Sequence, residues 1–134
     1  MTHNLIYTVN NAGAAVPIGN TVPVGSIIRR YGKCLDATGS AINLNESGYY
    51  DVDVSATFTA AAAGNVTLTL HQDGVPVAGA TGTETITTAN TEYANIAFMP
   101  KIRVKCCGNA RLSVVVGGTT APTIYNLAIG VEKR

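Results

Sequence analysis

The stretch Gly48–Ala60 constrains the fold of this chain more than any other, because apolar and polar residues alternate along it. Its even positions are Tyr50, Val52, Val54, Ala56, Phe58 and Ala60, whereas its odd positions are mostly Asp, Ser and Thr. Successive side chains of a strand point to opposite faces, so the stretch predicts one strand with an apolar and a polar face. At roughly 3.3 Å per residue, this strand would span about 40 Å. Its apolar face needs a second sheet to cover it, which predicts a β-sandwich.

Shorter segments with similar patterns lie on both sides of this strand. They are Asn4–Val9, Val24–Tyr31, Lys33–Asp36, Ala41–Asn45, Val66–Gln72, Val75–Ala80, Thr83–Thr87, Glu92–Val104, Ala110–Gly117 and Thr123–Glu132. The dipeptide Asp73-Gly74 is a strong signal for a tight hairpin turn. No window has the helical period with capping residues. We therefore predict an all-β fold, a two-sheet sandwich of about eight to ten strands. Its length fits a single domain over residues 1–134.

Two of these segments have faces that a sandwich core alone does not explain. In Thr123–Glu132, one predicted face holds Tyr125, Leu127, Ile129 and Val131, and the other holds Ile124, Asn126, Ala128 and Gly130. The segment Glu92–Val104, which we expect to bend at Pro100, carries Asn95 on a face with other small or apolar residues. Such residues on both faces of a strand indicate a core on one side and a partner on the other. We predict an oligomer interface containing Tyr93, Ala97, Met99, Asn126, Ala128 and Gly130; incidental exposure of these residues is the alternative.

The charge content limits the classes of partner. Charged residues make up 13% of the chain, about half the usual share, and the formal net charge is +1 at pH 7. So low a net charge argues against nucleic acid and anionic membrane surfaces as partners. No apolar run approaches the roughly 18 residues of a membrane-spanning helix, and the first residues do not form a signal peptide. We expect a protein that stays in the cytoplasm, or leaves it by lysis or as part of a particle.

Few residues could carry catalytic chemistry. His3 and His71 are the only histidines, which is too few for a metal site built from clustered His and Glu ligands. Asp51 and Asp53 share the outward face of the long strand. They fit a solvated polar face; the alternatives are a calcium site and, less favoured, a carboxylate pair for acid–base hydrolysis. No nucleophile motif or phosphate-binding loop is present. We predict no enzyme activity, no cofactor and no metal.

The cysteines and the basic residues leave two interpretations each. Cys34, Cys106 and Cys107 are odd in number, which favours free thiols packed as small apolar groups. A disulfide between Cys34 and one of the other two is the alternative. A basic stripe of Lys101, Arg103 and Lys105 is expected to continue to Arg111 on a neighbouring strand. The stripe fits a solvated face or, as the alternative, a contact for an acidic protein surface or anionic glycan.

The order of these segments resembles the tumour-necrosis-factor-like jelly roll, the fold of the globular heads of complement component and collagen-tip proteins. Gly48-Tyr49-Tyr50-Asp51-Val52 resembles the Gly-x-Tyr-x-Val entry to the central strand of that family. Val66–Val77 is similar to the strand, turn and strand that follow there, and Thr123–Glu132 lies where the family ends. The chain also resembles small jelly-roll proteins of phages and prophages of Gram-positive gut bacteria, and the heads of collagen-like spore-coat proteins.

The resemblance implies a homotrimer on a virion, acting as a head fibre, decoration or adhesin, with a capsid or a fibre stalk as its partner. No Gly-X-Y collagen stalk precedes the head in this sequence. Such a head would attach by many weak contacts, for example to host-surface glycans. Candidate contact residues in the predicted loops are Asn65, Asp73, Gly74, Thr119 and Thr120. The alternatives are a spore- or cell-surface head and a carbohydrate-binding module, for which Tyr49 and Tyr93 are the expected outward rings.

Overall fold

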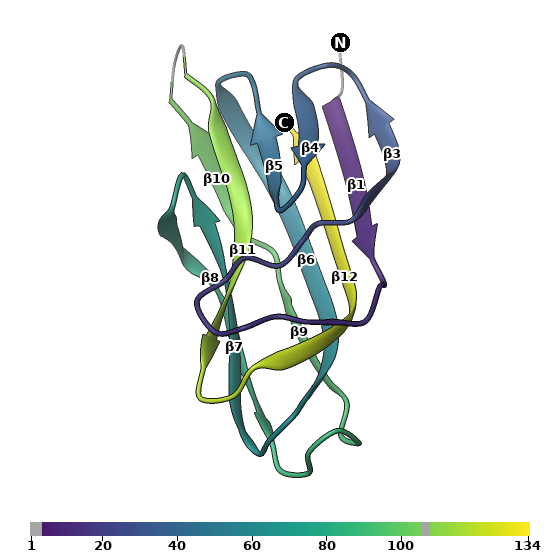
Figure 1. Ribbon diagram of the computed structural model, residues 1–134. Helices are drawn as coiled ribbons and strands as arrows, with labels where there is room; N and C mark the ends of the chain where they lie inside the picture. Colours follow the sequence, from purple (N-terminus) through teal and green to yellow (C-terminus); the bar gives the residue numbers. More distant parts are fainter. Residues whose placement is uncertain (1–3, 106–107) are drawn as a thin grey trace.

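The computed structural model describes residues 4–105 and 108–134, and within them the chain forms strands and no helix (Figure 1). The strands are β1 (Asn4–Asn10), β2 (Ala14–Ala15), β3 (Ser26–Tyr31), β4 (Leu35–Thr38), β5 (Ala41–Leu44), β6 (Gly48–Ala60), β7 (Gly64–Gln72), β8 (Val75–Ile86), β9 (Ala94–Phe98), β10 (Lys101–Val104), β11 (Ala110–Gly118) and β12 (Pro122–Lys133). The all-β prediction is therefore confirmed. There are more strands than the expected eight to ten, because one predicted strand is divided and the two-residue β2 was not foreseen.

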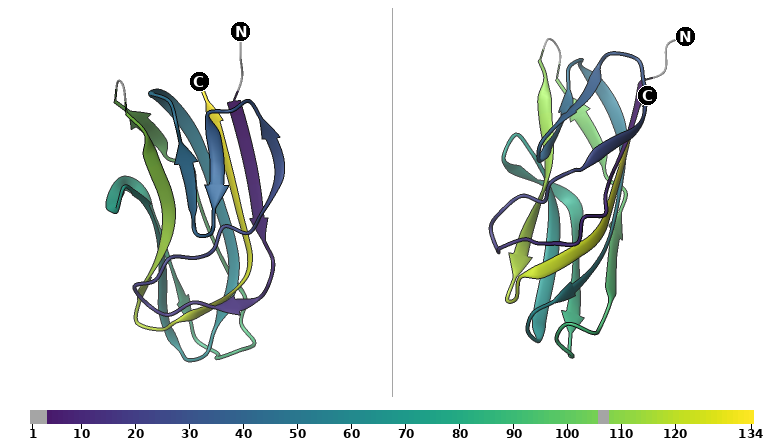
Figure 2. Two further views of the ribbon diagram at one scale, coloured as in Figure 1. Left: turned by 45° about the horizontal axis from the view of Figure 1, so that its top comes forward. Right: turned by 45° about the vertical axis from the view of Figure 1, so that its right-hand side comes forward.

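The strands form two antiparallel sheets that pack face to face (Figure 2). The seven-stranded sheet has the order β10-β6-β12-β1-β3, and β9 also pairs with β6 while β2 pairs with β12. The five-stranded sheet has the order β4-β5-β11-β7-β8. The predicted two-sheet sandwich is confirmed, and each sheet has one face on the shared core and one face pointing away from it.

β6 is the central strand of the seven-stranded sheet, and its bounds are those that the alternation predicted. It pairs with β12 on one side and with β9 and β10 on the other. Every even residue from Tyr50 to Ala60 is buried, and these residues belong to one apolar cluster with Leu68 and Val114 of the five-stranded sheet. Burying a Val, Leu or Phe side chain contributes roughly 1.5–3 kcal/mol. The long strand therefore forms the middle of the core.

The predicted strand Glu92–Val104 is divided into β9 and β10 by Met99 and Pro100. Pro100 has no N–H to give to a ladder, so the chain cannot continue as one regular strand through it. The Pro100 carbonyl still accepts a hydrogen bond from the N–H of Val52 at 3.1 Å. The expected bend is thus an interruption, and both pieces remain beside β6.

The hairpin at Asp73-Gly74 is confirmed. Both residues have positive φ, 54° and 82°, as the tight turns between paired strands require. The segments Val75–Ala80 and Thr83–Thr87 were expected as separate pieces, but the first and most of the second form the single edge strand β8. The pairing with β7 shifts register between Thr69 and His71, and residues 77–80 of β8 have no partner in β7.

Tyr125 does not share a face with Leu127, so this part of the prediction for the last strand is wrong. The pairing of β12 with β6 shifts register between Ile124 and Asn126, which makes Tyr125 the extra residue of a β-bulge. As a result Ile124 and Leu127 are both buried, and Tyr125 is exposed. A bulge reverses the alternation on one side of it, and hydrophobicity alone does not reveal its position.

Both ends of the described chain lie at the same end of the sandwich (Figure 1). Asn4 pairs with Lys133, and the N–H of Arg134 donates to the Tyr49 carbonyl at 2.9 Å. We call this the terminal end. The opposite end, where β6 finishes at Ala60 and β7 begins at Gly64, is the loop end. Nothing in the described residues forms a helix that could cross a membrane.

Candidate functional site

The face of the seven-stranded sheet that points away from the core, here the outward face, carries the predicted interface residues. In one row across the strands, Ala97 of β9 and Ala128 of β12 flank β6. In the next row toward the terminal end, Gly130 of β12 lies between Asp53 of β6 and Tyr7 of β1. Four of the predicted residues are therefore brought together at the centre of this face, and they are Ala97, Met99, Ala128 and Gly130.

The small side chains leave a shallow hollow of about 320 Å³ in the outward face. It is lined by Tyr7, Asp53, Val54, Ser55, Ala97, Met99, Ala128 and Gly130. Two of the lining residues are large and apolar and remain exposed: Met99 is 69% exposed and Tyr7 is 38% exposed. The other face of this sheet already covers the core. An exposed apolar area of this kind is typical of a contact with another protein.

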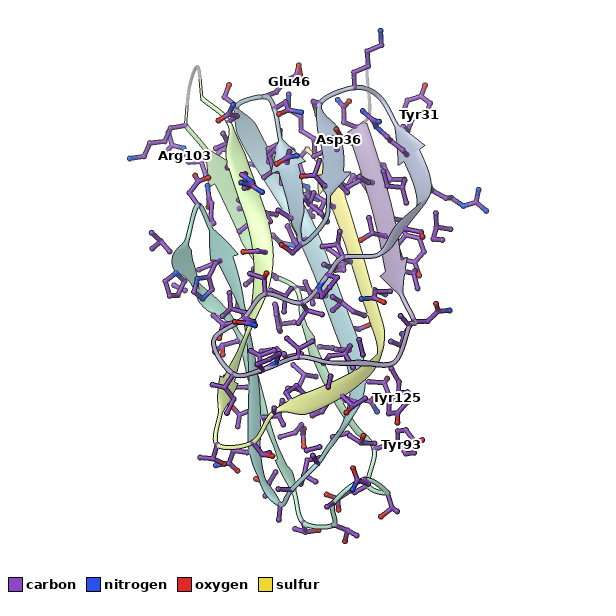
Figure 3. The ribbon with its side chains drawn as sticks, in the orientation of Figure 1. Tyr31, Asp36, Glu46, Tyr93, Arg103 and Tyr125 are labelled. Atoms are coloured by element: carbon purple, nitrogen blue, oxygen red, sulfur yellow. The ribbon has the colours of Figure 1, made fainter. Side chains whose placement is uncertain are left out.

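Tyr93 and Tyr125 form an exposed aromatic pair on the outward face near the loop end (Figure 3). Their ring centroids are 5.6 Å apart and the rings are tilted by 54°, within the geometry that aromatic pairs prefer. On the same face, the hydroxyl of Thr57 in β6 donates to Oδ1 of Asn95 in β9 at 2.6 Å. The predicted interface residue Asn126 follows Tyr125 and pairs with Thr57. The aromatic pair and the hollow thus occupy one continuous face.

Sequence reasoning missed three of the exposed tyrosines. Tyr7, Tyr31 and Tyr125 are 38%, 62% and 42% exposed, so the expectation that only Tyr49 and Tyr93 point outward is wrong. The bulge explains Tyr125. Tyr7 lies on β1 and Tyr31 lies on β3, the two strands beyond β12 from β6. Both belong to the outward face, which the five-stranded sheet does not cover. Alternation does not indicate Tyr7, because Leu5, Tyr7 and Val9 form the more apolar face of β1, whereas the structure buries Asn4, Ile6 and Thr8.

Asp51 and Asp53 share the outward face as predicted, but they have different surroundings. Lys101 Nζ lies 3.0 Å from Asp51 Oδ1, and Arg134 Nε lies 2.8 Å from Asp51 Oδ2. Asp53 has no ion pair within the described residues. The described residues contain no cluster of three His, Cys, Asp or Glu side chains that could hold a metal ion. With cations on Asp51, the arrangement favours an ion-paired surface over a calcium site.

The basic stripe is not continued by Arg111. β10 lies in the seven-stranded sheet and β11 in the five-stranded sheet, so these strands are not neighbours and that part of the prediction is wrong. Within the stripe, Lys101 is paired with Asp51, and the guanidinium of Arg103 lies 5.8 Å from the ring centroid of Tyr49. This distance is within the range of a cation–π contact. The backbone carbonyl of Arg103 also accepts a hydrogen bond from Gln72 of the other sheet.

The predicted ligand-contact residues fall into two groups at different ends of β7. Asn65, Thr119 and Thr120 lie together at the loop end, where the Asn65 carbonyl accepts the N–H groups of both threonines. The Thr119 hydroxyl accepts the N–H of Asn65 at 2.8 Å, and Thr120 is buried. Asp73 and Gly74 lie beyond the other end of β7, and Asp73 Oδ1 accepts the N–H of Arg111 at 3.0 Å. These residues therefore do not form one surface.

Cys34 is a buried free thiol in the described part of the chain. Burial raises its pKa, and burial likewise raises the pKa of the neighbouring phenol of Tyr50. The Tyr50 hydroxyl donates to the Glu46 carbonyl at 2.7 Å. Cys34 behaves as predicted for a small apolar side chain. Cys106 and Cys107, with the alternative disulfide to one of them, and His3 lie outside the described residues.

No protein-family model matches the sequence, and no curated protein matches it. Solved structures do match the fold. Mouse APRIL has a TM-score of 0.70 at 12% sequence identity, covering 98% of this chain and 99% of that chain. The globular domain of the zebrafish complement 1qA protein has a TM-score of 0.65 at 9% identity, covering 95% and 94%. The vertex protein P5 of PRD1 has a TM-score of 0.62 at 13% identity, covering 99% and 98%.

These comparisons extend over nearly the whole chain, and they include a complement globular domain of the kind that the sequence resembles. The fold is a tumour-necrosis-factor-like jelly roll. At such low identities the likeness concerns the fold, and function has to be argued from the surfaces of this chain.

Proposed function

We propose that this protein is a non-enzymatic head domain that works as a homotrimer, with the outward face of the seven-stranded sheet as the surface between the copies. The observation that carries the proposal is the hollow on that face, where Ala97, Ala128 and Gly130 lie between the exposed side chains of Tyr7 and Met99. A monomer would leave this apolar hollow and the Tyr93–Tyr125 pair in water. Burying them between copies removes that cost.

The sequence resemblance supports a trimer, because the jelly-roll heads that it resembles are homotrimers. One of the similar solved structures is named as a vertex protein of PRD1, which favours a structural part on a virion over an enzyme. In this role the protein would contact a capsid or a fibre stalk. Residues for catalysis are also not gathered anywhere in the described structure, where Cys34 is buried and His71 stands outside any cluster of metal-ligating side chains.

The distribution of charge supports an orientation for the head. The nine Lys and Arg residues all lie in the half of the sandwich next to the terminal end, and they are Arg29, Arg30, Lys33, Lys101, Arg103, Lys105, Arg111, Lys133 and Arg134. Both ends of the described chain also lie there. We therefore place the terminal end toward the support and the loop end outward.

The loops at the outward end are held in place by their own hydrogen bonds. Asn65 is bonded to Thr119, and the carboxylate of Glu92 accepts both the N–H and the hydroxyl of Thr87, at 2.8 and 2.9 Å. These two bonds lower the pKa of Glu92. Three such ends on one trimer would give weak contacts that add by avidity. Of the predicted contact residues, Asn65 and Thr119 are thus the ones that face a target.

The solution mass of the purified protein tests the proposal. Light scattering behind a sizing column, with and without reductant, should give a mass near three chains that reductant does not change. A mass of one chain at all concentrations would exclude the trimer. It would favour the second candidate, a carbohydrate-binding module in which the exposed Tyr93–Tyr125 pair is the platform for a sugar ring.

A further inference from the structure

A polar hollow lies on the face of the five-stranded sheet that points away from the core. Its volume is about 440 Å³, and it is lined by Thr21, Ser40, Ala41, Asp73, Gly74, Arg111 and Ser113. Asp73 and Gly74 are the predicted contact residues that lie away from the loop end, and Arg111 is the basic residue that does not continue the stripe. The hollow thus brings together residues that the proposed function does not use.

Backbone hydrogen bonds to β11 hold two of the segments around this hollow. The N–H of Asp73 donates to the Arg111 carbonyl at 2.9 Å, and the N–H of Arg111 donates to Asp73 Oδ1 at 3.0 Å. On the other side of β11, the N–H of Val22, next to Thr21, donates to the Val114 carbonyl at 2.8 Å. The hollow is therefore formed before any ligand arrives, and a ligand loses little free energy to ordering the chain around it.

The two charged side chains of the hollow do not pair with each other. Arg111 and Asp73 both line it, and neither forms an ion pair within the described residues. Asp73 Oδ1 accepts the Arg111 N–H, whereas Oδ2 accepts no hydrogen bond from the described part of the chain. The guanidinium and this second oxygen are thus open to a ligand that carries both an anionic group and hydrogen-bond donors.

The other lining residues select among anionic ligands. Thr21, Ser40 and Ser113 contribute hydroxyl groups, each of which can donate and accept a hydrogen bond. A guanidinium binds a carboxylate through two parallel hydrogen bonds. The carboxylate of Asp73 repels a doubly charged phosphate, but it accepts a hydrogen bond from a hydroxyl. A sugar with a carboxylate group meets all of these conditions, because its acid fits Arg111 and its hydroxyls fit the remaining side chains.

We propose that this hollow binds an acidic sugar of a glycan, with the sugar carboxylate on Arg111 and one sugar hydroxyl donating to Asp73. The hollow lies on the opposite side of the sandwich from the outward face, so it stays open in a single copy and in an assembly through the outward face. The inference therefore does not rest on the proposed trimer. In a trimer, three copies of a weak site would add by avidity.

NMR of the isotope-labelled full chain, titrated with methyl β-glucuronide and methyl β-glucoside, tests the proposal. The first probe has a carboxylate where the second has a hydroxymethyl group, and the two are otherwise the same. We expect methyl β-glucuronide to shift the amide signals of Gly74, Arg111 and Ser113 at millimolar concentration. Methyl β-glucoside, which lacks the acid, and acetate, which lacks the hydroxyls, should each bind at least tenfold more weakly.

Substitution of the two charged residues separates their roles. Arg111→Gln should lower the affinity for methyl β-glucuronide at least tenfold. Arg111→Lys keeps the charge but not the two parallel bonds, and should lower it at least threefold. Asp73→Asn keeps an oxygen for the Arg111 N–H but loses the acceptor for a sugar hydroxyl. It should reduce the preference for methyl β-glucuronide over acetate at least threefold, and strengthen the binding of inorganic phosphate.

Arg29→Gln is the matched control for Arg111→Gln, because it makes the same change at an exposed position of the other sheet. It should leave the affinity unchanged. Acetate or methyl β-glucoside that binds as tightly as methyl β-glucuronide would overturn the proposal. So would unshifted Arg111 signals with both methyl β-glucuronide and methyl β-galacturonide. The mass from light scattering decides the proposed trimer separately, so failure of the sugar site and failure of the trimer are distinguishable.

Discussion

The ring of Tyr125 packs against the ring of Tyr93, with 5.6 Å between the centroids, because a bulge turns Tyr125 away from the core. Regular alternation would have placed Tyr125 in the core with Leu127. The bulge instead brings Tyr125 to the outward face beside Tyr93 (Figure 3), the same face that holds the hollow. The shape of the proposed interface therefore depends on one extra residue in the last strand.

Removing either ring should weaken the trimer and leave the fold of one copy intact. Tyr93→Ala and Tyr125→Ala each delete apolar area at an exposed position and one partner of an aromatic pair, which contributes about 0.5–1.5 kcal/mol beyond its buried area. We expect the dissociation concentration measured by light scattering to rise at least tenfold. Val75→Ala is the control, because Val75 is 63% exposed on the edge strand of the other sheet. Equal effects of all three variants would argue against the outward face as the interface.

A charged side chain in the hollow should give a folded monomer. Ala128→Glu places a carboxylate on the outward face in the hollow that Asp53 also lines, where an apolar contact between copies would have to bury it beside a like charge. Burying an unpaired charge costs several kcal/mol, far more than the side chain gains. We expect a sizing-column mass of one chain with an unchanged circular dichroism spectrum. Thr83→Glu, at an exposed position of the five-stranded sheet, should remain a trimer. A trimeric Ala128→Glu protein would show that the hollow is not between copies.

The core of this fold was predictable from sequence because alternation needs no knowledge of distant contacts. Tyr50, Val52 and Phe58 follow the pattern of one strand, and the structure buries all three. The outward face was only partly predictable. Ala97, Ala128 and Gly130 stood out as small residues where a solvated strand would carry polar ones, whereas Tyr125 was misplaced because the bulge is set by pairing with β6.

Which residues from distant segments lie side by side in the seven-stranded sheet could not be predicted, since this depends on strand register. Arg29 and Asp53 are far apart in the sequence, and three successive pairings place them in one row. The prediction that Arg111 continues the basic stripe was wrong for a similar reason. Closeness in sequence to β10 suggested a shared sheet, but the chain crosses to the other sheet between β10 and β11.

Gly118 should be a sensitive position of the loop end. Its φ of 98° lies in the region that favours glycine, and an added Cβ would collide with the backbone carbonyl of Asn65. Gly118→Ala should therefore lower the free energy of unfolding by about 1–3 kcal/mol or more. Denaturant unfolding followed by circular dichroism measures this change.

Gly39→Ala is the matched control for Gly118→Ala. Gly39 also has a positive φ, 57°, but an added Cβ would meet nothing within 4 Å. Its cost should be limited to the backbone preference, about 1 kcal/mol. If Gly39→Ala proved as costly as Gly118→Ala, the close packing of Gly118 against Asn65 would not be what constrains the loop end.

Stability should fall at alkaline pH because two neighbouring acids are neutral in the folded core. Burial raises the pKa of Cys34 and of Tyr50, so both groups hold their protons more tightly in the folded than in the unfolded chain. The unfolded chain then releases protons first, and the free energy of unfolding decreases as pH rises through the unfolded pKa values. The decrease should begin at about pH 8.5, where an unfolded thiol ionises, and steepen near pH 10 with the phenol. Below about pH 8.5, these two groups do not make the free energy of unfolding depend on pH.

Thermal unfolding at a series of pH values measures the slope, and two variants assign it. Cys34→Ala should remove part of the decrease between the thiol and phenol ranges, and Tyr50→Phe should remove the steepening above them. Tyr50→Phe also deletes the hydrogen bond to the Glu46 carbonyl, so it should lower stability at every pH by about 1 kcal/mol as a constant offset. Only the change of slope with pH reports ionisation. Parallel curves for the original protein and both variants would show that Cys34 and Tyr50 do not link folding to pH.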